Sequence, residues 1–167
     1  MANTDEPRGA WPANRVLSMR NYSHGTAAAL YPGDFVIMNS AGKVVVATAG
    51  SAELLGVSVG YVPAATTTAL IYDDPDQEYW VQDDGAAATL AATNIGNNFD
   101  IVATAGNATL LKSQHELDAS DSSGTSAAQL RLLGYDPTDT IGKNVRCRVI
   151  INEECDRLAR MVNDVLD

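Results

Sequence analysis

Short apolar segments with polar residues between them follow one another along most of this chain, and turn-forming residues separate them. Residues 34–38 and 43–47 flank a turn at residues 39–42, which is the pattern of a β-hairpin. The clearest alternation lies at residues 145–151, where apolar residues alternate with two arginines. This period of two constrains the fold more than any other feature, and it predicts a mainly β protein with antiparallel strands.

Several further strands are expected, and some of them carry a local prediction. Glycines within the strand at 54–61 indicate a bulge or a close approach of the backbone. The strands at 67–72 and 78–82 are expected to pair with each other around an acidic turn. For residues 86–93, one helical turn and a loop stay equally open, because alanine favours a helix but turn residues bracket the segment closely. The remaining strands are expected at residues 99–102, 107–113 and 129–135.

The chain divides into three parts by its pattern. Residues 1–20 have no clean period and contain Pro7, Gly9 and Pro12, so we expect an extended N-terminal arm. Residues 21–152 are expected to form one antiparallel β-barrel or β-sandwich domain. The apolar period then changes to that of a helix, which predicts a short C-terminal α-helix over residues 153–167.

Both ends of the chain carry apolar side chains that need a surface. Trp11 on the arm can pack either on its own domain or on another subunit. The apolar stripe of the C-terminal helix can likewise lie on its own sheet or on the same helix of neighbouring subunits. The self-association candidates in that stripe are Leu158, Met161, Val162, Val165 and Leu166.

Positive charge is distributed unevenly along the chain. No lysine or arginine lies between Lys43 and Lys112, and the net charge is −10 at pH 7. Binding to nucleic acid is disfavoured, because affinity for DNA depends on lysine and arginine neutralising phosphates. The arginines gather instead near the C-terminus. Two ends of unlike charge suit a protein that docks one face on a partner.

The region without cations contains two acidic turns, where a metal ion could bind. A calcium loop of the EF-hand type is excluded, because Tyr79 stands where its glycine is required and Gly85 where its bidentate glutamate is required. A looser calcium or magnesium site stays open, and the simpler interpretation is a pair of solvated turns at the rim of a sheet. The candidate metal ligands are Asp73, Asp74, Asp76, Asp83 and Asp84.

The sequence contains no motif of a catalytic site. His24 and His115 are the only histidines, and neither belongs to a nucleophile motif, so we expect both to be ordinary surface residues. Cys147 and Cys155 are too few for a disulfide framework or a zinc site, so we expect two free thiols. No catalytic residue, cofactor or enzymatic activity is expected. The chain shows neither a membrane-spanning apolar run nor a secretory signal, which predicts synthesis in the cytoplasm.

An ordered set of short motifs resembles the head decoration, or cement, proteins of tailed bacteriophages. The resemblance runs from Leu30 to Glu153 and leaves out the N-terminal arm and the C-terminal helix. The motifs that carry it are Pro32-Gly33-Asp34-Phe35-Val36, Gly42-Lys43-Val44, Leu54-Leu55-Gly56-Val57, Tyr72-Asp73-Asp74-Pro75, Val81-Gln82-Asp83-Asp84-Gly85, Asn94-Ile95-Gly96-Asn97-Asn98, Glu116-Leu117-Asp118, Leu130-Arg131-Leu132-Leu133-Gly134 and Val149-Ile150-Ile151-Asn152-Glu153.

This resemblance implies a β-barrel or β-sandwich that binds the outer surface of a phage capsid and bridges neighbouring major capsid subunits to stabilise the head. It implies a homo-oligomer, a homotrimer first and a dimer second, made in the host bacterial cytoplasm and located on the virion. It implies no cofactor, no direct contact with nucleic acid and no membrane. The candidate capsid contacts are Trp11, Arg15, Arg20, Arg146 and Arg148.

Two other classes of protein stay open. A tail or head-completion component of the virion could have a similar β core, and the copy number per particle separates it from a decoration protein. The second alternative is a calcium-dependent carbohydrate-binding module on the particle. A calcium titration of the wild type and of Asp74→Asn and Asp76→Asn variants tests it.

Overall fold

The computed structural model describes residues 2–51, 53–86, 88–121 and 128–152. These residues are almost entirely strands and connections, with one 3-10 turn, η1 (Ala92–Asn94). The predicted mainly β class is therefore confirmed. The strands are β1 (Trp11–Pro12), β2 (Met19–Ser23), β3 (Phe35–Met38), β4 (Val44–Val46), β5 (Gly56–Ser58), β6 (Thr68–Tyr72), β7 (Glu78–Gln82), β8 (Asn98–Phe99), β9 (Ile101–Asn107), β10 (Lys112–Leu117), β11 (Leu130–Tyr135) and β12 (Arg146–Ile151).

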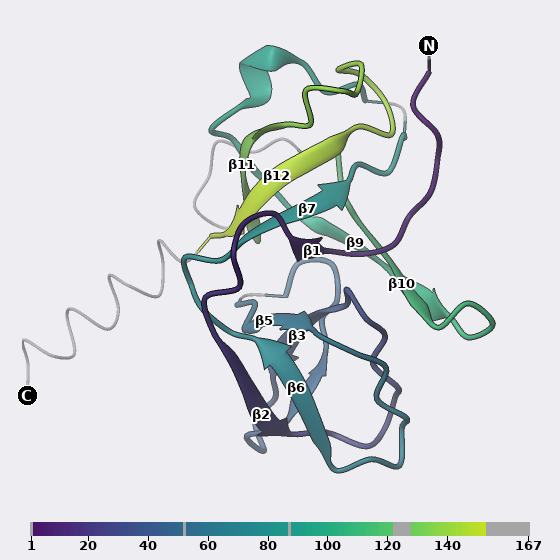
Figure 1. Cartoon of the computed structure of the whole chain (residues 1–167), viewed down its shortest axis with the longest axis vertical. Coiled ribbons are helices and arrows are strands. Elements are labelled where there is room, and N and C mark those ends of the chain that lie inside the picture. Colours follow the sequence, from purple (N-terminus) through teal and green to yellow (C-terminus); the bar gives the residue numbers. More distant parts are fainter. Residues whose placement is uncertain (1, 52, 87, 122–127, 153–167) are drawn as a thin grey trace, which may run out of the picture.

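These strands form three antiparallel sheets (Figure 1). The first sheet has the order β1-β7-β12-β11-β8, and the second has the order β2-β6-β5-β3-β4. The hairpin β9–β10 is a two-stranded sheet whose far end projects to the right in Figure 1. None of the three sheets closes on itself. The barrel, one of the two expected architectures, is therefore wrong for the described strands.

One apolar core joins the three sheets. In β7 and β12 alternate residues are buried, so Tyr79 and Val81 face the same side as Cys147 and Val149. Phe35 of the second sheet packs into the same cluster. The expected alternation of β12 is confirmed, because every second residue of this strand is buried. The expected hairpin is also confirmed, because β3 pairs with β4 across a short turn.

The centre of the second sheet is buried on both faces, whereas its edge strand β2 is largely exposed. Phe35 belongs to the core shared with the first sheet, whereas its neighbour Val36 belongs to a smaller cluster with Leu30, Val44 and Ile71. Adjacent residues of a strand point to opposite faces, so the two clusters lie on either side of this sheet. The first sheet differs, because its face away from the core carries half-buried and exposed side chains.

The expected pairing between the strands at 67–72 and 78–82 is wrong. β6 pairs with β2 and β5 in the second sheet, whereas β7 pairs with β1 and β12 in the first. In this arrangement Tyr72 lies opposite Val57, and Tyr79 lies opposite Val149. Both strands thus find apolar partners that are distant in sequence. Proximity along the chain favoured a hairpin, and long-range packing overrode it.

The acidic turn between β6 and β7 is the crossing from one sheet to the other. Its turn chemistry is as expected, because Asp74 accepts the Asp76 N–H on its carboxylate and the Gln77 N–H on its carbonyl. Gln77 is fully buried after the turn. The Gln77 side chain accepts the Leu17 N–H at 3.0 Å and donates to the Asn14 side chain at 2.6 Å. These bonds attach the crossing to the N-terminal arm.

Three other segments differ from the expectation in their extent. Only Gly56–Ser58 of the segment 54–61 is a strand, and the expected close approach is present there, because a Cβ on Gly56 would lie 1.8 Å from the Tyr72 carbonyl oxygen. Residues 108–111 form a turn, so the strand expected at 107–113 begins only at Lys112. Of the segment 86–93, residues 86 and 88–91 are a loop, and η1 begins at Ala92.

The predicted C-terminal helix and its self-association candidates lie outside the described residues, as does Cys155. Cys147 is a free, buried thiol, as expected. Within the ranges described, η1 is the only helical element, and no helix there is long and apolar enough to cross a membrane.

Candidate binding face

The first sheet has one face on the core and one face accessible to solvent. Across β1, β7 and β12, Trp11 lies opposite Trp80, and Trp80 lies opposite Arg148. Directly opposite residues of antiparallel strands share a face. The neighbours of Trp80 on β7 are fully buried on the core side, so this row lies on the accessible side. We call the row, together with Arg146 and Ile150 of β12, the binding face.

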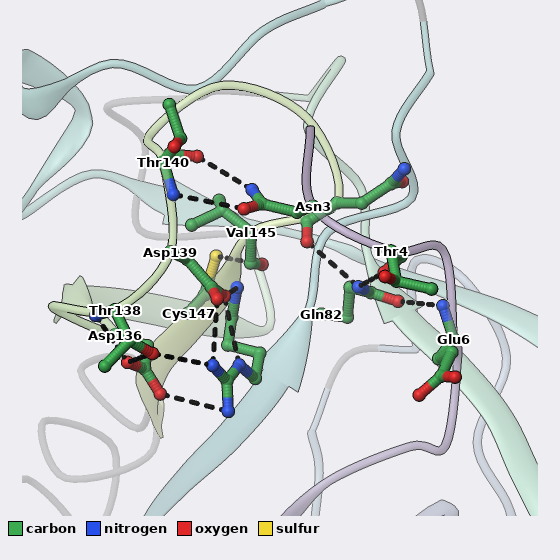
Figure 2. A network of polar contacts seen from close by, with 12 residues as sticks. Asn3, Thr4, Glu6, Gln82, Asp136, Thr138, Asp139, Thr140, Val145 and Cys147 are labelled. Carbon is green, nitrogen blue, oxygen red and sulfur yellow. Dashed lines mark hydrogen bonds and ion pairs between the residues drawn. The ribbon is translucent and has the colours of Figure 1, made fainter. Parts of the chain in front are cut away.

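Arg146 is held at the edge of the binding face by an acidic turn at residues 136–139. Its Nε and Nη2 donate to Asp139 at 3.0 and 2.8 Å, and its Nη1 lies 3.2 Å from Asp136. Figure 2 shows these two carboxylates and Thr138 gathered at one guanidinium group. The hydrogen bond from Arg146 holds the pKa of Asp139 below its usual value. Because these carboxylates already pair with its guanidinium group, Arg146 has a mainly structural role at the edge of the binding face.

Arg148 is less committed to its own chain. Its Nε lies 3.5 Å from the Glu78 carboxylate, and its side chain is 46 % exposed. An exposed ion pair of this kind contributes little to folding stability. The Arg148 guanidinium is therefore accessible to a carboxylate or carbonyl group on another protein.

The first residues of the N-terminal arm are attached to the rest of the fold through side-chain amides (Figure 2). Asn3 accepts the Thr140 N–H at 3.1 Å and donates to the Thr140 carbonyl oxygen at 2.7 Å. Gln82 accepts the Glu6 N–H at 2.9 Å and donates to the Thr4 carbonyl oxygen at 2.7 Å. The arm therefore follows its own domain up to Trp11, where β1 begins.

Two hollows share Arg8 and Trp11 as a common wall. The smaller, of about 220 Å³, is polar and lies between the arm and Arg146, but the side-chain amides of Asn3 and Gln82 in its lining are already used in the hydrogen bonds of Figure 2. The Arg8 guanidinium lies 5.6 Å from the centre of the Trp11 ring. The larger hollow, of about 380 Å³, opens towards the second sheet. We call it the apolar groove, and its apolar lining is Ala10, Trp11, Pro12, Pro32, Val59 and Tyr72.

The structure groups three of the five candidate capsid contacts and separates the other two. Trp11, Arg146 and Arg148 belong to the binding face. Arg20 lies on β2 in the second sheet, where its Nε is 3.3 Å from the Asp73 carboxylate. Arg15 is exposed in the connection between β1 and β2.

The five candidate metal ligands do not converge on one site. Asp73, Asp74 and Asp76 precede β7, whereas Asp83 and Asp84 follow it. A strand of this length separates its ends by roughly 17 Å. Among the residues that the structure describes, no group of three possible ligands is arranged to hold a metal ion.

The acidic turns are also not simply solvated, which corrects the simpler expectation. Asp83 is fully buried and accepts the N–H groups of Val145 and Gly85. Burial raises the pKa of Asp83. The Asp73 side chain is 3 % exposed and accepts the Tyr22 hydroxyl at 2.6 Å. Burial and this hydrogen bond raise the pKa of Tyr22 to about 12. Both carboxylates act as structural hydrogen-bond acceptors.

The expectation that both histidines lie on the surface is wrong. His24 and His115 are each 1 % exposed. His115 Nδ1 accepts the Phe35 N–H at 3.1 Å, and the two rings stack. Burial lowers the pKa of His115, although the nearby Asp34 opposes that shift. The residues next to His115 in the sequence are polar, which suggested an exposed segment. In β10, however, alternate residues face the core, and His115 is one of them.

Glu116 on β10 is expected to make folding depend on pH. Burial, followed by the charges of Asp5, Asp84 and Asp83, raises its pKa from 4.5 to about 7. As the pH falls through 7, the folded chain binds a proton that the unfolded chain binds only near 4.5, so this group stabilises the fold on acidification. Glu116→Gln should therefore raise the Tm at pH 8 and leave it unchanged near pH 4. Thermal unfolding of variant and wild type at both pH values measures this, and equal Tm values at pH 8 would contradict the raised pKa.

Sequence reasoning missed Trp80 and Ile150 as members of the binding face. The alternation of residues 78–82 does place Trp80 on the side away from Tyr79. It does not tell which strands lie beside β7, and only their register puts Trp11 and Arg148 on either side of Trp80.

No family profile matches the chain, and no curated protein is similar to it. The candidate function therefore follows from the geometry of the binding face together with the motif resemblance.

Proposed function

We propose that this chain is a structural protein of a phage virion that binds the outer surface of the capsid and bridges neighbouring major capsid subunits. Its role is binding, without enzymatic turnover and without a cofactor. The observation that carries the proposal is the binding face, where Trp11, Trp80 and Arg148 form one accessible row.

The composition of this face supports a protein partner. Tryptophan and arginine are enriched at the energetic centres of protein–protein interfaces, because each combines a large contact area with hydrogen-bonding groups. Here two half-buried tryptophans stand beside an arginine in a chain whose net charge is −10. A capsid surface that presents carboxylates and carbonyl oxygens would be attracted by Arg148, although the negative net charge of the chain as a whole would repel such a surface.

The finer architecture belongs to the same proposal. The first and second sheets share one core, which supports a sandwich as the arrangement of the domain. On a capsid, self-association as a trimer or a dimer would repeat the binding face by symmetry. Several weak contacts made at once then give an avidity that one copy lacks.

Reversing one charge on the binding face tests the proposal. Arg148→Glu is expected to lower occupancy on purified heads assembled without this chain by at least roughly tenfold, because it places a carboxylate where the partner is expected to be acidic. Lys43→Glu makes the same change of charge at the exposed β3–β4 turn, outside the binding face. It should leave occupancy unchanged. Occupancy is measured by sedimenting the heads with each purified protein and quantifying the bound chain.

Thermal melting of the isolated Lys43→Glu variant should match the wild type, because this side chain is exposed. Arg148→Glu exchanges an exposed ion pair with Glu78 for a repulsion, so we expect only a small fall in its melting temperature. Equal losses of occupancy for Arg148→Glu and Lys43→Glu would mean that net charge alone matters, and the binding face would be the wrong surface. Failure of the wild-type protein to bind the heads at all would reject the capsid-binding function.

A further inference from the structure

The hairpin β9–β10 ends in an exposed pair of leucines that the fold does not use. Leu110 is 62 % exposed and Leu111 is 45 % exposed. Their loop projects beyond the sheets at the right of Figure 1. Two adjacent aliphatic side chains at the end of a projecting hairpin are available for contact with another molecule.

This tip is held in one conformation. The Asn107 side chain accepts the N–H groups of Thr109 and Leu110 at 3.0 and 2.9 Å, which closes the turn. Leu111 has a φ of 49°, a left-handed backbone conformation that a branched side chain rarely adopts. A loop without a function for its side chains would favour glycine there. The turn therefore carries two exposed leucines at some cost in backbone strain.

The apolar groove beside Trp11 offers a matching recess. Its volume is about 380 Å³, and Arg8, Ser58 and Lys112 line it together with the apolar side chains. Lys112, which directly follows the tip, also lines this groove. The hairpin thus leaves from the border of the groove, yet its own leucines remain exposed instead of filling it.

We propose that Leu110 and Leu111 of one copy insert into the apolar groove of a second copy of this chain. The tip and the groove lie next to each other on the surface, so a two-fold axis close to Lys112 lets two copies exchange tips reciprocally. The biological role of this contact rests on the proposed function, because copies bound to the capsid would touch one another through this surface. The contact itself is a property of the isolated protein.

The charges of the chain predict how this contact responds to salt. Each copy has a net charge of −10, and Arg8 and Lys112 border each groove, so two copies repel one another overall. The two leucines that would make the contact carry no charge. Screening by salt should therefore strengthen the association, whereas a contact held by ion pairs would weaken.

Sedimentation equilibrium of the full chain and three variants tests the exchange. The double change Leu110→Ser and Leu111→Gly removes the tip, and glycine accepts the φ of 49° freely, so the fold should be kept. Val59→Lys places a charge in the groove from the opposite side of the contact. Ile95→Ser is the control, because Ile95 is an equally exposed aliphatic residue, at 48 %, beside η1.

The wild type and Ile95→Ser are expected to self-associate equally, and more tightly at higher salt. The tip and groove variants should each weaken association by at least roughly tenfold, with melting temperatures no lower than that of the control. A monomeric wild type at about 1 mM, or association that weakens with salt, would overturn the exchange. So would a groove variant that associates like the wild type. A monomeric protein that still occupies heads would reject this inference and leave the proposed function standing.

Discussion

Gly56→Ala is expected to destabilise the fold by at least about 3 kcal/mol, a large share of the roughly 5–15 kcal/mol that holds a domain of this kind together. β5 lies between β3 and β6 in the second sheet. The added Cβ would lie 1.8 Å from the Tyr72 carbonyl oxygen and 2.9 Å from its carbonyl carbon. Backbone atoms in a paired strand cannot turn aside as a flexible side chain can, so β5 and β6 would have to separate.

Gly60→Ala is the matched control for this change. It lies four residues further along the same chain segment, and a Cβ there meets no atom within 4 Å. We expect its free energy of unfolding to stay within about 1 kcal/mol of the wild type. Urea unfolding of both variants gives the comparison. If the two alanine variants were equally stable, the close packing of β5 on β6 would be refuted.

Removal of residues 2–10 is expected to lower the free energy of unfolding by about 4 kcal/mol. The deletion removes the Asn3 bonds to Thr140 and leaves the buried Gln82 amide without Thr4 and Glu6 as partners. A net value of about 1 kcal/mol for each such hydrogen bond gives this estimate. It also removes buried Ala10, whose N–H donates to the Gly33 carbonyl oxygen at 2.9 Å. From the sequence, three candidate capsid contacts were placed in this arm, Trp11, Arg15 and Arg20, and no role in folding was predicted for it.

Arg15→Ala is the control for the stabilising effect of the arm. Arg15 is exposed, so its truncation should change the free energy of unfolding by less than about 0.5 kcal/mol. Chemical denaturation of the shortened chain and of Arg15→Ala provides the measurement. A shortened chain as stable as Arg15→Ala would mean that the bonds of Figure 2 contribute nothing to folding.

Local patterns predicted the elements well where one strand or one turn contained the whole signal. The alternation of β12 and the hairpin β3–β4 are examples, because burial of every second residue and turn chemistry act over a few residues. The close approach at Gly56 was also readable, since glycine in a strand indicates a neighbouring backbone. The two histidines were placed wrongly, because their polar neighbours suggested a surface. The alternation of β10 buries His115, whereas His24 is buried directly after β2 ends.

Only part of the binding face could be predicted from the sequence. Trp11, Arg146 and Arg148 were named in advance, but they were named together with Arg15 and Arg20, which lie elsewhere. A list of residue types contains no strand order, and register decides which side chains become neighbours.

The amino-acid sequence by itself determined that this is a β protein with short strands, tight turns and an acidic middle, because these properties arise from side chains a few positions apart. Only the tertiary structure decided that β6 and β7 part at the acidic turn and that Trp11, Trp80 and Arg148 share one face. The pairing of strands depends on apolar burial summed over distant segments. Its free energy belongs to the whole core and to no single stretch of the chain.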